Sequence, residues 1–354
     1  MTSETTKSPA RHRVPLAGIS SRAWEHPADR GALTALRELR GFDQVVKALN
    51  AVWNERAYRL MYLGGAVRVD HRQYSRVYRL FAEAGAVLDV PELPELYVRF
   101  DRTLNGACVG MAQPFIVINT GAVELLDDEE LRVLLGHELG HLRSGHAVYR
   151  TIMLWLLEAG QTLAFVPGGT IALRVIMSAM YEWWRKAELS ADRAGLLAGQ
   201  DPAASLRLAM KLAGGGDLTQ IDTTAFLEQA AEFERSGDLR DSLLRMMLVA
   251  RSTHPMPVAR AAELRQWVDS GAYPRILAGH YPRRSDDASA PVGDDVKAAA
   301  DHYREAFRDS QDPLVNLLRK IGDGASGIGE RVGGARAWPW SSSAGRGGAP
   351  DNGS

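Results

Sequence analysis

The chain has 354 residues, of which 45% are hydrophobic and 24% are charged. These values are typical of a globular protein and exclude disorder along the whole length. Lys and Arg number 42 against 43 Asp and Glu, which leaves a net charge of -1, so no nucleic acid partner is expected. The single cysteine, Cys108, excludes an internal disulfide and any zinc site with two or more thiolates. A metal site in this chain must therefore use mainly His and carboxylate ligands.

The pattern of polar and apolar residues changes twice between residues 1 and 119. Residues 1–27 are polar and lack the apolar core of a secretory signal peptide, so we expect a flexible arm and a cytoplasmic protein. Residues 27–86 carry apolar side chains at spacings of three and four, which predicts helices. The segments 95–101 and 115–119 are β-branched and aromatic with turn residues between them, which predicts a small sheet. Helical patterns then continue to about Leu277.

The segment 151–184 is strongly apolar and requires its own interpretation. It is broken by Glu158, Pro167 and Arg174, so its pieces are shorter than the ~20 apolar residues that a membrane-spanning helix needs. We expect a hairpin insert at about 149–184, formed by two core helices. The alternative is a hairpin that dips into a membrane, which would give peripheral membrane contact through 151–184.

The last part of the chain is predicted to form a tail. After residue 282 the sequence becomes polar, and it ends in a stretch of low complexity rich in Gly and Ser. We therefore expect residues 283–354 to be mostly disordered, with one amphipathic helix near 296–321. Residues 28–282 remain as one domain of the α+β class, predominantly helical, in which the small sheet precedes a helix with two closely spaced histidines.

That helix lies within the stretch from Leu125 to His146, where acidic residues at the start suit a helix N-terminus. His137 and His141 are four residues apart, so they share one helix face and both imidazoles can reach the same ion. Glu138 stands beside the first histidine, where it can act on a metal-bound water without being a ligand. This HExxH pattern, in a capped helix soon after a strand, predicts the site of a zinc peptidase.

Two histidines leave a tetrahedral zinc one protein ligand short, with a further position for water. The metzincin pattern requires Gly at 144 and His at 147, but the chain has Ser144 and Ala147, and His146 is one residue out of place. The peptide deformylase pattern requires a different sequence around its cysteine than the NGACVGM that surrounds Cys108. A glutamate remains as the third ligand, as in the gluzincins.

Glu188 is the best candidate for that glutamate, because it lies in the helical segment that follows the apolar hairpin. Asp192 comes one helical turn later on the same face and could accept a hydrogen bond from a ligand histidine. In the alternative interpretation, Glu188 and Asp192 pair with Lys186 and Arg193 on a solvated helix face.

Together these motifs resemble the HtpX-like and CAAX-prenyl-protease family of gluzincin metallopeptidases. The resemblance implies a zincin-like catalytic domain with one zinc ion per chain, held by His137, His141 and Glu188, with Glu138 as the base. Its elements follow the family's order: Leu104–Ala107, Phe115–Leu126, HELGH with His146, the pair Glu188 and Asp192, and Ser252–Arg260.

The family's downstream His-Pro element is similar to His254-Pro255, with Arg260 six residues later. Such residues could approach the cleft, His254 to stabilise the oxyanion and Arg260 to brace Asp192. His254 could equally begin a helix without any catalytic task.

We therefore expect a zinc-dependent metalloendopeptidase that hydrolyses peptide bonds through a zinc-bound water activated by Glu138. Its partner is a peptide or protein substrate, which we expect to align along a free edge of the strand 115–119. The alternative is a latent or non-hydrolytic zinc protein that acts as a regulated adaptor, with a membrane-associated form left open. The sequence leaves the oligomeric state unknown.

Overall fold

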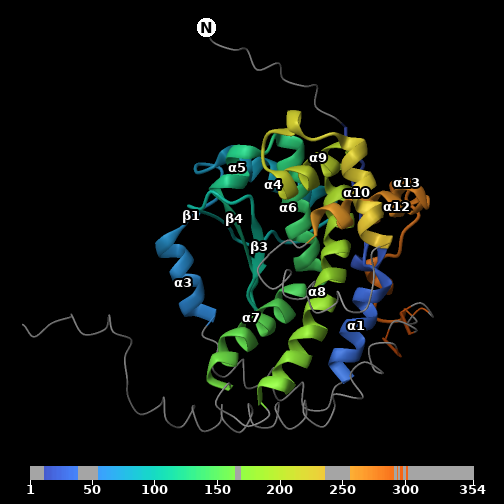
Figure 1. Cartoon of the computed structure of the whole chain (residues 1–354). Coiled ribbons are helices and arrows are strands. Elements are labelled where there is room, and N and C mark those ends of the chain that lie inside the picture. Colours follow the sequence, from blue (N-terminus) through green and yellow to red (C-terminus); the bar gives the residue numbers. More distant parts are fainter. Residues whose placement is uncertain are drawn as a thin grey trace, which may run out of the picture.

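The structure is a computed structural model and describes residues 12–38, 55–163, 169–235, 256–290, 293, 296–297 and 300–301, without the side chains of 35–38, 155–163, 169–179, 182 and 234–235. Within this part of the chain, helices surround one small sheet (Figure 1), which confirms the predominantly helical α+β fold. The helices are α1 (Pro27–Glu38), α3 (Glu55–Gly65), α4 (Ser75–Val87), α5 (Thr120–Leu125), α6 (Asp128–Arg143), α7 (His146–Leu163), α8 (Gly169–Gly199), α9 (Pro202–Gly214), α10 (Thr223–Arg235), α12 (Pro257–Asp269) and α13 (Ala272–Leu277), with short 3-10 helices at Ser21–Ala23, Leu218–Gln220 and Arg284–Asp286.

The sheet has the strand order β1-β2-β4-β3. β2 (Leu96–Arg99) and β4 (Phe115–Asn119) are the two predicted strands, and they pair in parallel. Two further strands lack a predicted counterpart: β1 (Val67–Arg68) and β3 (Gly106–Val109), which pair antiparallel with β2 and β4 respectively. Both missed strands are short, and β3 begins at a glycine, so neither carries a strong strand pattern.

The expectation that the strand 115–119 offers a free edge is wrong. β4 lies between β2 and β3, and all five of its residues are buried. A continuous apolar run such as FIVIN is typical of a central strand, because both faces of the strand are covered. The edge next to α6 belongs to β3 instead, which pairs with no strand other than β4 among the described residues.

The two faces of the sheet bury different side chains, as the alternation of a strand requires. On one face, Tyr97 and Phe115 pack against Tyr62 of α3, with the rings of Tyr62 and Phe115 5.2 Å apart. On the other face, Ile116 and Ile118 belong to the main core, which includes residues of α4, α6 and α8. The helix that carries the HExxH motif is therefore packed against the inner face of the sheet.

α6 begins with the predicted cap, since the Asp127 carboxylate accepts the backbone N–H of Glu130 at 2.8 Å and Glu130 reaches back to the Asp127 N–H. The helix then packs very closely on α8, because glycines of α6 face alanines of α8. A Cβ added at Gly136 would lie 2.3 Å from Ala198 Cβ, and one added at Gly140 would lie 2.5 Å from Ala194 Cβ.

The predicted flexible arm 1–27 needs correction from residue 12 onward. Leu16, Ile19 and Trp24 are buried, and the Leu16 N–H donates to the Val87 carbonyl at the end of α4. Ile19 also forms a β-bridge with Arg283, so the folded unit extends past the expected domain limit of 28–282 at both ends. The three apolar side chains in a polar stretch are too few to give a periodic pattern, yet each fills a gap in the core.

The apolar segment 151–184 forms parts of α7 and α8, which pack on each other and extend away from the sheet (Figure 1). At the base of this hairpin, Ile152, Met153 and Trp184 are buried, while Leu154 is exposed. No helix in the described part of the chain is long and apolar enough to span a lipid bilayer. The predicted joint at Pro167 and most of the predicted tail and its helix lie outside the described residues.

Candidate metal centre

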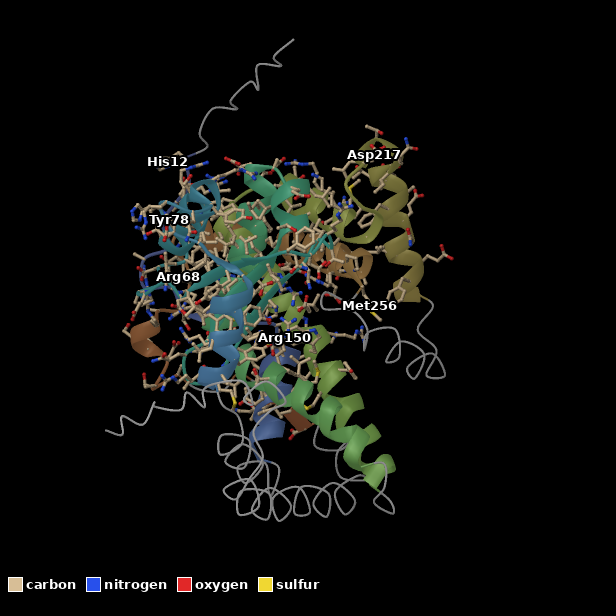
Figure 2. The ribbon with its side chains drawn as sticks, turned by 90° about the vertical axis from the view of Figure 1, so that its left-hand side faces the viewer. His12, Arg68, Tyr78, Arg150, Asp217 and Met256 are labelled. Atoms are coloured by element: carbon tan, nitrogen blue, oxygen red, sulfur yellow. The ribbon has the colours of Figure 1, made fainter. Side chains whose placement is uncertain are left out.

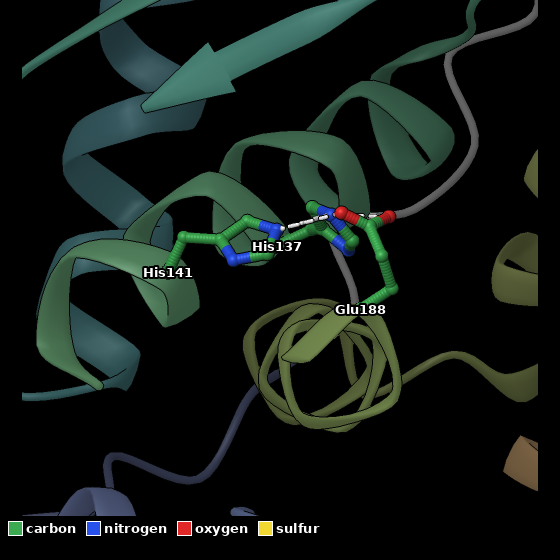
Figure 3. Close-up of side chains that lie close together, drawn as sticks. All are labelled: His137, His141 and Glu188. Carbon is green, nitrogen blue, oxygen red and sulfur yellow. Dashed lines mark hydrogen bonds and ion pairs between the residues drawn. The ribbon is translucent and has the colours of Figure 1, made fainter. Parts of the chain in front are cut away.

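The two histidines of the HExxH motif lie one above the other on the face of α6 that meets α8. Their Nε2 atoms are 3.1 Å apart, and both side chains are buried. This arrangement follows from the helix itself, because residues i and i+4 share a face. Figure 3 shows both rings turned toward the same point above α8.

Glu188 reaches that point from α8. Its Oε1 lies 3.2 Å from His141 Nε2 and its Oε2 lies 3.7 Å from His137 Nε2 (Figure 3). One donor atom from each of the three residues falls within 4.8 Å of the others, so together they could hold a metal ion. The solvated-face interpretation of Glu188 is wrong, because its side chain is 0% exposed.

The donor chemistry of this group fits zinc. Two imidazole nitrogens and one carboxylate oxygen form the three-ligand set of catalytic zinc sites that leave a fourth position open. Burial lowers the pKa of His141 well below its usual 6.5, with the charge of His137 acting in the same direction and Glu188 opposing it. His141 is therefore a neutral imidazole at neutral pH, which is the form that binds a metal.

Asp192 and Arg260 form a charged layer behind His137 and Glu188. Asp192 Oδ1 lies 3.0 Å from His137 Nδ1, the ring nitrogen that faces away from the group. Arg260, from α12, donates to Asp192 through Nε at 2.7 Å and also pairs with Glu188 Oε2 at 2.7 Å. Burial opposes the charge on Asp192, but Arg260 and His137 outweigh it and lower the pKa of Asp192 to about 2.

His141 has a different set of neighbours, which the sequence analysis missed. Its Nδ1 lies 2.9 Å from Nδ1 of His146, the first residue of α7, and His146 Nε2 lies 3.0 Å from Asp29 of α1. The sequence singled out His146 only as one residue out of place for a metzincin ligand and as part of the family resemblance, without a role beside His141. Asp29 gave no signal.

An aromatic ring packs directly against His141. The Trp184 ring stacks on the His141 ring with centroids 4.9 Å apart and an angle of 10°. Arg150 covers the Trp184 ring at 4.9 Å, and Figure 2 shows Arg150 at the root of the α7–α8 hairpin. The ring of His141 is thus fixed by packing as well as by polar contacts.

Glu138 points from α6 toward the edge strand of the sheet. It is fully buried, and a Cβ placed on Gly106 of β3 would come within 2.7 Å of its Oε1. The Glu138 carboxylate therefore lies directly against the backbone of β3, beside the two histidines. His254, the other predicted catalytic residue, lies outside the described residues.

A helix with HExxH beside a sheet edge, joined by a glutamate from α8, defines this protein as a metallopeptidase. The chain belongs to peptidase family M48, whose family model matches residues 71–268.

Curated relatives agree with this family. The chain is 35% identical to the plastoglobule-localized metallopeptidase 48 of Arabidopsis thaliana over 72% of this chain and 74% of the relative. It is 26% identical to a protease HtpX homolog of Streptococcus gordonii over 31% of this chain and 37% of the relative. It is also 24% identical to a protease HtpX homolog of Lactobacillus helveticus over 40% of this chain and 44% of the relative. The matched regions span less than half the length of the HtpX relatives, and no solved structure matches the chain.

Proposed function

We propose that this metallopeptidase is a zinc-dependent endopeptidase, with His137, His141 and Glu188 as the zinc ligands and Glu138 as the base. The observation that carries the proposal is the convergence of three donor groups, buried within 4.8 Å of one another, next to a buried glutamate. Zinc, when bound there, would lower the pKa of a water molecule and polarise the scissile carbonyl.

The residues of this chain would divide the remaining tasks. Glu138 would take the proton from the attacking water and return it to the leaving amine, since its carboxylate lies beside the histidines. Asp192 would hold His137 with Nε2 facing the metal, because the hydrogen on Nδ1 is donated to its carboxylate. Arg260 would keep both Asp192 and Glu188 in their charged forms.

We further propose that a peptide substrate lies along β3. This strand is the sheet edge next to Glu138, so an extended peptide could add to it through main-chain hydrogen bonds. Binding of this kind depends little on the side chains of the substrate. The substrate class is therefore an extended segment of a peptide or protein.

The test of the base is Glu138→Gln, assayed with a library of peptides and by metal analysis. We expect this variant to keep one zinc per chain while kcat falls by about 10²- to 10⁴-fold. Glu124→Gln, an equivalent change at an exposed residue of α5, is the matched control and should leave both quantities unchanged. Cleavage by Glu138→Gln at the wild-type rate would remove Glu138 from the mechanism.

The test of the third ligand is Glu188→Ala. We expect zinc content to fall well below one per chain, because the remaining two histidines cannot complete the site. Equal zinc in this variant and the wild type would contradict the assignment. A wild-type protein that binds zinc but cleaves no peptide would instead support the latent adaptor.

For the location we propose the cytoplasm, with peripheral membrane contact through residues 151–184. The extension of α7 and α8 away from the sheet supports this contact (Figure 1), as does a relative named for its place at plastoglobules. Flotation with liposomes of neutral and anionic lipid tests it. Recovery of the full chain only in the soluble fraction would count against the contact.

A further inference from the structure

A buried chain of polar groups leads from His141 to the N-terminal helix. His141 Nδ1 and His146 Nδ1 are 2.9 Å apart, and His146 Nε2 is 3.0 Å from Asp29 Oδ2. The three side chains are at most 1% exposed. They come from α6, α7 and α1, so no local pattern in the sequence brings them together.

The positions of the hydrogens in this chain follow from its geometry. Two ring nitrogens in contact can share only one hydrogen, so one Nδ1 donates and the other accepts. If His141 is to present a free Nε2 lone pair, its own hydrogen must sit on Nδ1. His146 Nδ1 then accepts that hydrogen, which leaves the hydrogen of a neutral His146 on Nε2, the atom that lies 3.0 Å from Asp29 Oδ2.

Asp29 is held firmly as the end of this chain. Its Oδ1 accepts the indole N–H of Trp183 at 2.9 Å, and its Oδ2 accepts the Ser190 hydroxyl at 2.6 Å. Burial opposes the charge of Asp29, but His146 and these hydrogen bonds outweigh it and lower the pKa of Asp29. Trp183 and Ser190 belong to α8 on either side of Glu188, so α1 is fastened to the segment that supplies the glutamate.

We propose that His146 and Asp29 are positioning residues that hold His141 with its Nε2 directed at the metal. The inference rests on the proposed zinc site. It gives the two histidines different supports: His137 donates directly to a carboxylate, whereas His141 reaches its carboxylate through a second imidazole. The N-terminal helix α1, outside the matched family region, thereby becomes part of the metal centre.

The decisive comparison is His146→Leu against His146→Asn, two side chains of similar size. Asn offers an oxygen near the position of Nδ1 that can accept from His141, whereas Leu offers no acceptor. We expect the zinc dissociation constant, measured by competition with a chromophoric chelator, to rise about 10- to 100-fold in His146→Leu. His146→Asn should recover most of this loss. The absorption spectrum of the cobalt-substituted protein should shift in His146→Leu and return toward wild type in His146→Asn.

Two further variants separate positioning from folding. Thr151→Val, a buried change on the same helix that leaves the polar chain intact, is the control and should bind zinc like the wild type. Asp29→Asn should weaken zinc binding more than Thr151→Val does, and circular dichroism of each metal-free variant reports folding. If His146→Leu does not fold, Asp29→Asn decides the question, since it is predicted to bind zinc more weakly than Thr151→Val.

The outcomes are distinct. Wild-type zinc affinity and an unchanged cobalt spectrum in the folded His146→Leu and Asp29→Asn variants would overturn the positioning role while leaving the proposed function intact. A wild-type protein that binds no zinc would refute the proposed function itself, and this inference with it.

Discussion

Gly140, inside the HExxH motif, provides the sharpest test of how the metal centre is assembled. Its Cα faces α8 so closely that a Cβ in Gly140→Ala would lie 2.5 Å from Ala194 Cβ and 3.3 Å from Ala191 Cα. Carbon atoms normally approach to about 3.5–4.0 Å. The substitution must therefore push α6 and α8 apart by about 1 Å. Because His141 is on one helix and Glu188 on the other, this movement also separates the proposed ligands.

Two opposing effects determine the stability of Gly140→Ala. Ala is favoured over Gly in a helix interior by about 1 kcal/mol, while overpacking a core typically costs about 1–3 kcal/mol. The contact at Gly140 is between backbone-anchored atoms that cannot turn aside, so we take the upper end of that cost. We expect a net loss of about 2 kcal/mol in the free energy of unfolding and weaker zinc binding.

Urea denaturation with a double-mutant cycle measures this balance. Ala194→Gly removes the opposing Cβ, so in the double variant Gly140→Ala/Ala194→Gly the zinc affinity should return toward wild type and the two changes should be non-additive. Gly64→Ala is the matched control, because its Cβ in α3 would meet no atom within 4 Å. That variant should gain stability from helix propensity alone. The close-packing explanation fails if Gly140→Ala is stabilised as much as Gly64→Ala.

Two further predictions concern Cys108 and Glu83. Burial, with the charge of Glu138 adding to it, raises the pKa of the Cys108 thiol, so a thiol reagent at about pH 8 should label the chain only after denaturation; rapid labelling of the folded protein would contradict this. Burial opposes the charge on Glu83, but its ion pairs with Arg132, at 2.6 Å, and with Arg79 lower its pKa below 4.5. The stability from Glu83 is therefore present above pH 4.5 and lost as pH falls through the lowered pKa. Between about pH 6 and pH 3, the free energy of unfolding should fall less in Glu83→Gln than in the wild type. An equal fall in the two proteins would refute the role of Glu83.

Much of the fold could be predicted because its patterns are local. Apolar residues spaced for helices, and the segments 95–101 and 115–119, give the helices and the two central strands. The edge strand β3 was missed because Gly106–Val109 is four residues long and owes its strand pairing to β4. Which strand forms an edge depends on pairing across the sheet, and the pattern of one strand does not contain that information.

The residues of the proposed site also fall into two groups, those that the sequence predicts and those that only the tertiary structure brings together. The sequence alone determined that His137 and His141 share a helix face with Glu138 beside them, because helical geometry relates residues four apart wherever the helix lies. It also pointed to Glu188, since a third donor was needed and Glu188 lies in the helical segment that follows the apolar hairpin. Only the tertiary structure decided that Asp29 supports the site, because a buried carboxylate and an exposed one look identical in a sequence. Their difference arises when distant helices pack and exclude water, as α1, α7 and α8 do around Asp29.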